Sequence, residues 1–196
     1  MIALAAAVGY LIGSLPTAGG LARLWGVDLR SQGSRNPGTA NALRTSGPWL
    51  AVTVLTVEAT KGYAAVAAGL AVADGDGAIA AGLGAVAGNV YNIWYRFRGG
   101  KGLGISLGVL AALWPLVLVP VVAMIATGMV TTRSSGIASL LAVAALVASS
   151  VIWPSLGWPT GGLEPGRRVP ALAIGIAALI SWKHWRDVPL SSLSRP

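Results

Sequence analysis

A polar stretch, GSRNPGTANALR at residues 33–44, concentrates hydrogen-bonding and cationic groups between two long apolar runs. Gly33 and Gly38 allow the backbone to turn and to approach a ligand closely, and Arg44 offers a forked cationic donor. The neutral hydrogen-bonding side chains are Ser34, Asn36, Thr39 and Asn41. Arginine beside backbone amides is a natural cradle for phosphate. The simpler interpretation is a solvated loop that caps two helices.

A second polar stretch, RFRGGKG at residues 96–102, combines three cations with three glycines. Glycines beside Lys101 predict exposed backbone N–H groups next to a positive charge, which is the arrangement of phosphate-binding loops. The stretch is not a Walker A motif, because the spacing differs and Leu103 stands where Ser or Thr is needed. An inward-facing membrane anchor would explain the cations but not the glycines.

Polar residues within the apolar runs are the remaining candidates. Glu58 and Lys61 are three residues apart and share one helix face, so they form either a functional site or a structural ion pair. Asn89 and Asn92 are expected to bind substrate or to bridge helices. The chain has no cysteine and a single histidine, His184, which excludes thiolate chemistry and argues against a histidine-rich metal site.

The composition indicates an integral membrane protein. Of the 196 residues, 55% are hydrophobic and only 10% are charged, and the mean hydropathy is +0.71. A soluble domain carries about 25% charged residues. The net charge of +8 is divided among short segments. This distribution fits cytoplasmic loops that face anionic lipid, and it argues against nucleic-acid binding.

We expect an all-α, polytopic bundle of seven transmembrane helices that forms a single domain over residues 1–196. The apolar runs expected to span the membrane are 2–24, 49–73, 78–95, 136–153 and 169–182, with a turn at 74–77. The stretch 103–130 contains Pro115 and Pro120. It forms either one long span or two short helices that turn near Trp114.

The positions of lysine and arginine in the short loops predict the orientation of the chain in the membrane. Two spans separate the basic loops 25–48 and 96–102, and the turn between those spans carries two aspartates, so both loops are expected to be cytoplasmic. Two short helices at 103–130 would also place Arg133 and the basic tail inside, whereas one long span would place both outside. The charge rule therefore favours seven helices, an external N-terminus and a cytoplasmic C-terminus.

At these residues the chain resembles the bacterial acyl-phosphate:glycerol-3-phosphate acyltransferase family, PlsY. The family has motifs close to GSGNPGATNVLR, DxxKG and GHxxPVFxxFKGGKG. The corresponding segments here are GSRNPGTANALR (33–44), EATKG (58–62) and GNVYNIWYRFRGGKG (88–102). Their order and spacing match. The resemblance implies a seven-helix enzyme of the bacterial inner membrane that transfers a fatty acyl group from acyl phosphate to the 1-hydroxyl of glycerol 3-phosphate. The products would be lysophosphatidic acid and phosphate.

The resemblance also implies roles for individual residues, and it implies no metal, other cofactor, acyl-CoA or covalent acyl-enzyme. The implied catalytic residues are Ser34, Arg44, Lys101 and His184. The implied substrate-binding residues are Asn36, Gly38, Asn41, Lys61, Asn89, Gly99, Gly100, Gly102, Ser134 and Ser135. Glycerol 3-phosphate, acyl phosphate and membrane lipid are the expected partners, and the sequence makes no prediction of oligomeric state.

The chain departs from the family pattern at several positions. Arg35 replaces a glycine, Thr39-Ala40 inverts Ala-Thr, and Asn89 replaces a histidine. Asn92 replaces a proline, and Asp187 stands where an asparagine belongs. These departures favour one alternative, a catalytically weak or inactive paralogue that binds lipid or phosphate. A separate alternative is a small-anion transporter. No internal repeat of the kind found in many transporters is present, which disfavours the second alternative.

Overall fold

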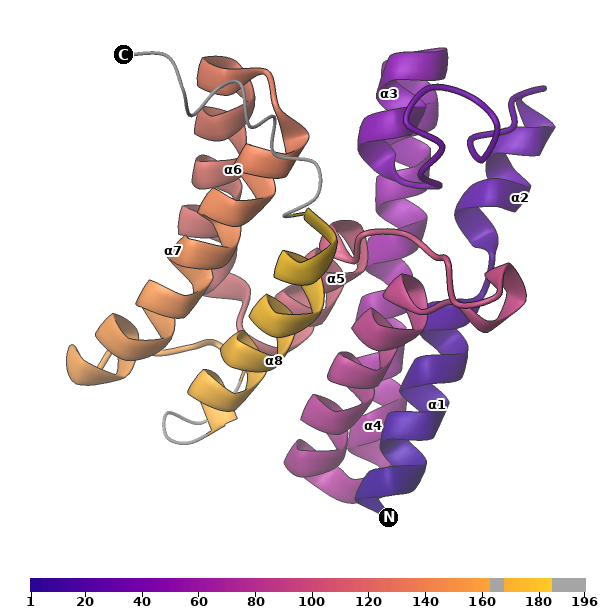
Figure 1. The fold of residues 1–196 in the computed structure, drawn as a ribbon. Coiled ribbons are helices and arrows are strands. Elements are labelled where there is room, and N and C mark those ends of the chain that lie inside the picture. The colour runs from indigo at the N-terminus through magenta and orange to yellow at the C-terminus, as the bar shows by residue number, and fades with distance from the viewer. Residues whose placement is uncertain (163–167, 185–196) are drawn as a thin grey trace.

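The computed structural model describes residues 1–162 and 168–184, and within those ranges it is helical and contains no strand (Figure 1). The helices are α1 (Ile2–Ser14), α2 (Thr17–Leu24), α3 (Thr39–Ser46), α4 (Pro48–Val90), α5 (Leu103–Leu113), α6 (Leu118–Thr132), α7 (Ser135–Ser155) and α8 (Arg168–His184). Short 3-10 turns occur at η1 (Ile93–Tyr95) and η2 (Pro115–Val117).

Helix α4 is bent into two antiparallel segments at the predicted turn. Ala73 and Asp74 leave the helical conformation, and Asp74 has a φ of 49°. With α4 counted as two segments, and with the eight-residue helices α2 and α3 set aside, the described chain runs up and down in seven helical segments (Figure 1). By length and apolar composition, residues 2–24, 48–95, 115–132 and 135–155 are suited to cross a membrane. The predicted all-α, seven-helix membrane fold is confirmed.

The stretch 103–130 forms two short helices rather than one long span. Helix α5 has 11 residues. At 1.5 Å per residue it is about 16 Å long, or roughly half the thickness of the hydrocarbon core. Trp114 lies fully buried at the turn that follows, and its ring packs edge-on against Trp153 with the centroids 5.7 Å apart. Trp114 and Val117 of the turn between α5 and α6 are therefore packed inside the protein, whereas Leu116 is exposed.

Small residues bring α1 against the second segment of α4. A side chain on Gly9 would overlap the backbone of Ala81, and a side chain on Gly13 would overlap the backbone of Ala85. Membrane helices use such residues to bring their backbones close together. This contact fixes the end of α1 beside the segment that leads into residues 96–102.

The polar stretch 25–48 is not a loop throughout, which corrects the expectation from sequence. Its final third forms α3, and Gly47, with a φ of 83°, separates α3 from Pro48 at the start of α4. Alanine, leucine and arginine within α3 are strong helix formers. Polarity alone had suggested a loop, although an exposed helix can be equally polar.

The bend in α4 and the start of α8 are joined at one end of the bundle. Arg168 Nε lies 2.9 Å from Asp76 Oδ1, and both side chains are about half exposed. Helix α3 lies at the end opposite the N-terminus (Figure 1). The two polar stretches thus lie away from the acidic bend.

Candidate active site

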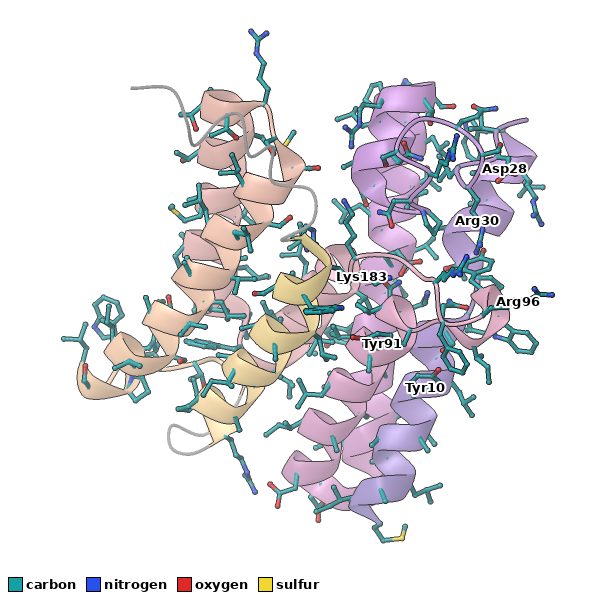
Figure 2. The ribbon with its side chains drawn as sticks, in the orientation of Figure 1. Tyr10, Asp28, Arg30, Tyr91, Arg96 and Lys183 are labelled. Carbon is teal, nitrogen blue, oxygen red and sulfur yellow. The ribbon has the colours of Figure 1, made fainter. Side chains whose placement is uncertain are left out.

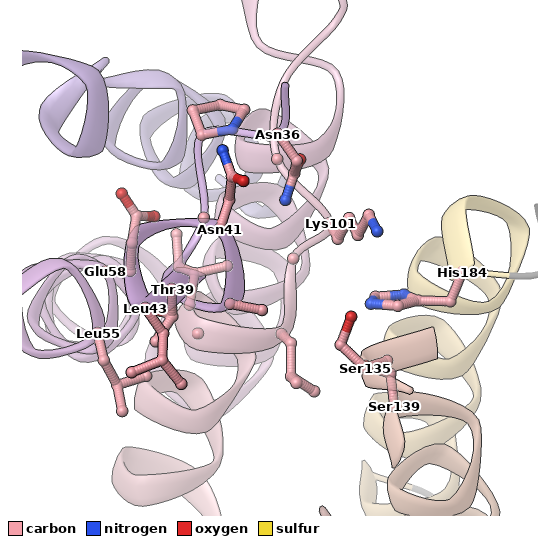
Figure 3. A pocket seen from close by; sticks show the side chains of 18 of the residues that line it. Asn36, Thr39, Asn41, Leu43, Leu55, Glu58, Lys101, Ser135, Ser139 and His184 are labelled. Atoms are coloured by element: carbon pink, nitrogen blue, oxygen red, sulfur yellow. The ribbon is translucent and has the colours of Figure 1, made fainter. Parts of the chain in front are cut away.

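A cavity of about 290 Å³ brings together residues that are far apart in the sequence (Figure 3). All four predicted catalytic residues line it, namely Ser34, Arg44, Lys101 and His184. The predicted substrate-binding residues in its lining are Asn36, Gly38, Asn41, Asn89, Gly100, Gly102 and Ser135. The lining does not include Lys61, Gly99 or Ser134. The structure thus gathers most of the predicted site in one place.

Two helices begin at this cavity without a side-chain cap. Helix α3 begins at Thr39 after Gly38, and α5 begins at Leu103 after Gly102. All four of these residues line the cavity. The first N–H groups of a helix lack intrahelical acceptors and carry partial positive charge. Two such ends in one cavity favour an anionic ligand.

The glycines of the second stretch act differently from the expectation. Gly99 N donates to Val90 O at 3.1 Å, Gly100 N donates to Asn89 O at 2.9 Å, and Gly102 N donates to Asn89 Oδ1 at 3.2 Å. These N–H groups are therefore engaged within the protein rather than exposed for phosphate. Gly99 also has no room for a side chain, because a Cβ there would overlap Asn89 O. The glycines shape the turn that presents Lys101.

Lys101 and Arg44 place two cations near each other in the cavity. The pKa of Lys101 is lowered, first by burial and then by the positive charges of Arg44 and Lys183. Mutual repulsion among cations raises the energy of the site when no anion is bound. A bound phosphate would remove that penalty, because opposite charge favours the protonated form of lysine.

Glu58 is the centre of a buried network at the cavity wall. Its carboxylate lies 3.1 Å from Lys61 Nζ, accepts from Asn89 Nδ2 at 2.6 Å and accepts from Thr17 Oγ1 at 2.9 Å. Lys61 also donates to Leu15 O at 2.9 Å. Lys61 therefore neutralises Glu58 and ties α4 to the break between α1 and α2. This network keeps the charge of Glu58 compensated beside a cavity suited to anions.

Asn41 organises the first polar stretch from within. Its Oδ1 accepts from Ser34 N at 2.8 Å, and its Nδ2 donates to Leu29 O at 2.9 Å and to Gln32 O at 3.0 Å. The side chain is fully buried. These bonds use three of the hydrogen-bonding positions of the amide and hold Ser34 at the cavity edge.

The wall opposite these stretches comes from α7 and α8. His184 is buried, and its Nδ1 lies 3.0 Å from Ile180 O. A carbonyl only accepts, so Nδ1 carries the hydrogen and the neutral ring has its acceptor at Nε2. The imidazole of His184 and the hydroxyl of Ser135 point into the cavity opposite Lys101 (Figure 3). Ser134 instead caps α7, with its Oγ accepting from Ile137 N at 3.4 Å.

Several lining residues escaped the sequence analysis. Ser139 lies one helical turn after Ser135 on α7, so an i, i+4 pattern would have revealed it. Large apolar side chains complete the lining, and these are Leu43, Leu55, Leu103, Ile105, Leu107, Ile125 and Met129. Nothing in the local sequence distinguishes these residues from other membrane-facing positions. The cavity therefore has both a cationic and an apolar part.

The structure places most of the residues that depart from the family pattern. Arg35 adopts a φ of 57°, a left-handed conformation that favours glycine and costs other residues roughly 1–2 kcal/mol. Asn92 Nδ2 donates to Ser14 O at 2.6 Å, and its Oδ1 accepts from Trp94 N at 3.0 Å. Thr39 and Ala40 both line the cavity. Asp187 lies outside the described residues.

These features define a class: a multi-pass helical membrane protein with a cavity that combines cations, helix N-termini and apolar side chains. No group of three or more His, Cys, Asp or Glu side chains that could hold a metal ion occurs in residues 1–162 and 168–184.

Comparison with known proteins identifies the family. The family model described as "Glycerol-3-phosphate acyltransferase" matches residues 3–189, and the chain belongs to this family. A glycerol-3-phosphate acyltransferase of Synechococcus sp. (strain JA-3-3Ab) is 45% identical over 71% of this chain and 69% of the relative. One from Symbiobacterium thermophilum is 34% identical over 93% of this chain and 87% of the relative. The resemblance found in the sequence is thus confirmed.

Solved structures agree with this assignment. The glycerol 3-phosphate form of PlsY (YgiH), an integral membrane glycerol 3-phosphate acyltransferase, superposes with a TM-score of 0.81 at 28% identity. Its lysophosphatidic acid form gives a TM-score of 0.80 at 26% identity. Both comparisons cover 99% of this chain and 93% of the solved chain.

Proposed function

We propose that this protein transfers a fatty acyl group from acyl phosphate to the 1-hydroxyl of glycerol 3-phosphate. The products are lysophosphatidic acid and inorganic phosphate. The observation that carries the proposal is the convergence of Arg44, Lys101 and two uncapped helix N-termini on one cavity. Both substrates carry phosphate, and the forms of the related solved structure include one with glycerol 3-phosphate and one with lysophosphatidic acid.

The chemistry requires alignment and charge neutralisation. The glycerol oxygen attacks the acyl carbonyl carbon, a new C–O bond forms, and the bond from that carbon to the phosphate oxygen breaks. The hydroxyl proton passes to a phosphate oxygen of the substrate. Arg44 and Lys101 neutralise the anions as they approach each other, and Ser34 orients glycerol 3-phosphate. The substrates need no nucleophile from the protein because acyl phosphate is already activated.

The apolar part of the cavity suits the acyl chain of the donor. Leu103 and Leu107 come from α5, whereas Ile125 and Met129 come from α6. These side chains lie on the same cavity as Lys101, so one amphiphilic molecule can contact both parts. His184 and Ser135 complete the polar wall and hydrogen-bond the phosphate or the glycerol backbone.

The hydrogen bonds of Asn89 favour an active enzyme over an inactive paralogue. Although it replaces a histidine of the family motif, it donates to Glu58 and accepts from Gly102 N. A neutral imidazole offers the same pair of one donor and one acceptor. The replacement therefore preserves a positioning role, and no titrating group is needed at this position.

The proposed enzyme is a single domain in the bacterial inner membrane. Its basic loops 25–48 and 96–102 face the cytoplasm, the N-terminus lies outside and the C-terminus lies inside. The lysine and arginine residues concentrated in these two loops support this orientation. Glycerol 3-phosphate would then enter from the cytoplasm.

A donor comparison tests the proposal. Purified protein in lipid nanodiscs receives labelled glycerol 3-phosphate with palmitoyl phosphate, palmitoyl-CoA or palmitate. We expect labelled lysophosphatidic acid, with equimolar phosphate release, from palmitoyl phosphate alone. Product from palmitoyl-CoA but not from palmitoyl phosphate would overturn the donor assignment. Absence of product from all three donors, with binding retained, would favour the inactive paralogue.

A further inference from the structure

A second cavity, of about 620 Å³, shares no lining residue with the first. Its lining consists of Arg23, Arg30, Trp94, Tyr95, Arg96 and Arg98. These residues come from the end of α2, from the segment that follows α2, and from η1 with the residues after it. Arg30 and Arg96 lie along the same edge of the molecule (Figure 2). The proposed acyl transfer uses none of these residues.

Arg30 is held in a fixed position but lacks a complete set of acceptors. Its guanidinium carbon lies 4.1 Å from the centroid of the Tyr95 ring, a cation–π contact. Within the described chain, Arg30 Nη1 is buried and has no hydrogen-bond partner. A buried donor without an acceptor costs free energy. The Arg30 side chain lines this cavity and contributes a positive charge to it.

The charge of the cavity specifies the ligand as an anion. Four guanidinium groups line it without a carboxylate, and none of them forms an ion pair with another residue in ranges 1–162 and 168–184. Asp28 is the acidic neighbour, but its Oδ1 accepts from the backbone N of Arg30 at 3.0 Å and the residue lies outside the lining. Guanidinium groups match phosphate oxygens in pairs, so a phosphate group fits this cluster better than a single carboxylate does.

The surface beside the cavity is apolar and exposed. Leu24 is 81% exposed, Trp94 is 66% exposed and Phe97 is 60% exposed. Aromatic residues next to arginine are typical of the boundary between lipid and water, where anionic headgroups lie. A free phosphate ion would use the arginines but leave these side chains without a partner. A phospholipid would engage both.

We propose that this second cavity binds the phosphate headgroup of an anionic phospholipid, whose acyl chains lie along Leu24, Trp94 and Phe97. The site adjoins the proposed active site through the chain itself, because Arg98 is followed by the turn that presents Lys101. A bound lipid would thus contact the same segment that binds the substrates. The site is separate from the catalytic cavity and does not depend on the proposed reaction.

The test uses variants that remove charge while preserving the backbone. Arg96 has a φ of 52°, and asparagine tolerates this left-handed conformation, so Arg96→Asn combined with Arg23→Gln empties the cavity of two cations. Arg133→Asn is the matched control, because Arg133 is exposed, has a φ of 53° and lines neither cavity. All variants carry Lys101→Ala, which weakens phosphate binding at the first cavity.

Native mass spectrometry of the protein in detergent then counts bound phosphatidic acid, phosphatidylglycerol and phosphatidylcholine. We expect retention of one anionic lipid by the Lys101→Ala protein and by the Arg133→Asn control, with an affinity at least about 10-fold lower in the Arg23→Gln/Arg96→Asn variant, a loss of about 1.4 kcal/mol. Equal binding of phosphatidylcholine would contradict the charge argument. Displacement of the lipid by equimolar inorganic phosphate would contradict the lipid assignment. Unchanged binding by the double variant would overturn the site.

Discussion

The side-chain amide of Asn89 donates a 2.6 Å hydrogen bond to Glu58 Oε2, and this bond ties the end of the second segment of α4 to the buried ion pair on its first segment. The same amide accepts from Gly102 N at 3.2 Å. Gly102 directly follows Lys101, so the position of this cation depends on a carboxylate on a different helical segment. The ion pair and the cationic turn are therefore one structural unit.

Replacement of Asn89 tests whether this unit positions the turn. We expect Asn89→Leu to lower kcat/KM by about 10-fold or more, because it removes one hydrogen bond from Glu58 Oε2 and leaves the Gly102 N–H without its acceptor, a cost of about 1–3 kcal/mol. Asn89→His should retain most of the activity, because a neutral imidazole provides one donor and one acceptor. Steady-state kinetics in nanodiscs measure both. Equal activity of Asn89→Leu and the wild type would show that the bond does not position Lys101.

The ion pair between Glu58 and Lys61 should matter chiefly for folding. Lys61→Met leaves a buried carboxylate without its cation, which costs about 3–5 kcal/mol. The double variant Glu58→Gln/Lys61→Met removes both charges and should recover most of the lost stability. Thermal unfolding of the purified proteins in detergent gives the comparison. If the double variant were as unstable as Lys61→Met, the pair would not explain the loss.

The lowered pKa of Lys101 predicts a pH dependence of substrate binding. Burial and neighbouring cations favour the neutral form, whereas a bound phosphate favours the protonated form. Affinity for glycerol 3-phosphate should therefore fall as pH rises through the lowered pKa of the free protein. Lys101→Arg keeps its charge throughout the alkaline range, so its affinity should remain level. Calorimetric titrations from about pH 7 to about pH 10 compare the two proteins. Parallel declines in both would assign the titration to another group.

Because α1 packs closely against α4, alanine substitutions at two glycines should differ sharply in their effect on stability. Gly9→Ala places a methyl group against the backbone of Ala81, which should destabilise the protein by about 1–3 kcal/mol. Gly20→Ala is the matched control, because a Cβ there has no neighbour within 4 Å. Thermal unfolding in detergent should show a lower Tm for Gly9→Ala only. A similar Tm for both variants would argue against close helix contact.

Hydropathy and the charge rule predicted much of this architecture. The bend at Asp74 followed from a polar interruption between two apolar runs, and Pro115 marked the turn between α5 and α6. Helix α3 was missed because polar residues dominate its sequence. Its formation depends on packing against α4, which local sequence does not reveal.

The sequence likewise predicted only part of the candidate site. Residue type identified Arg44 and Lys101 as candidates, and the family resemblance added His184, but neither predicted the backbone hydrogen bonds around Lys101. The N–H groups of Gly99 and Gly100 are bonded to carbonyls of α4, because the turn folds back onto the end of that helix. Only the three-dimensional path of the chain reveals this contact. The helix N-termini that line the cavity without a side-chain cap are instead those of α3 and α5.

The central claim is that Lys101 neutralises phosphate during acyl transfer. The most direct measurement is the rate of lysophosphatidic acid formation from palmitoyl phosphate and glycerol 3-phosphate by Lys101→Ala, beside the folded controls Lys101→Arg and Arg96→Asn. We predict a loss of at least about 100-fold for Lys101→Ala, equivalent to about 2.7 kcal/mol, with substantial activity in both controls. Full turnover by Lys101→Ala would contradict the proposed role.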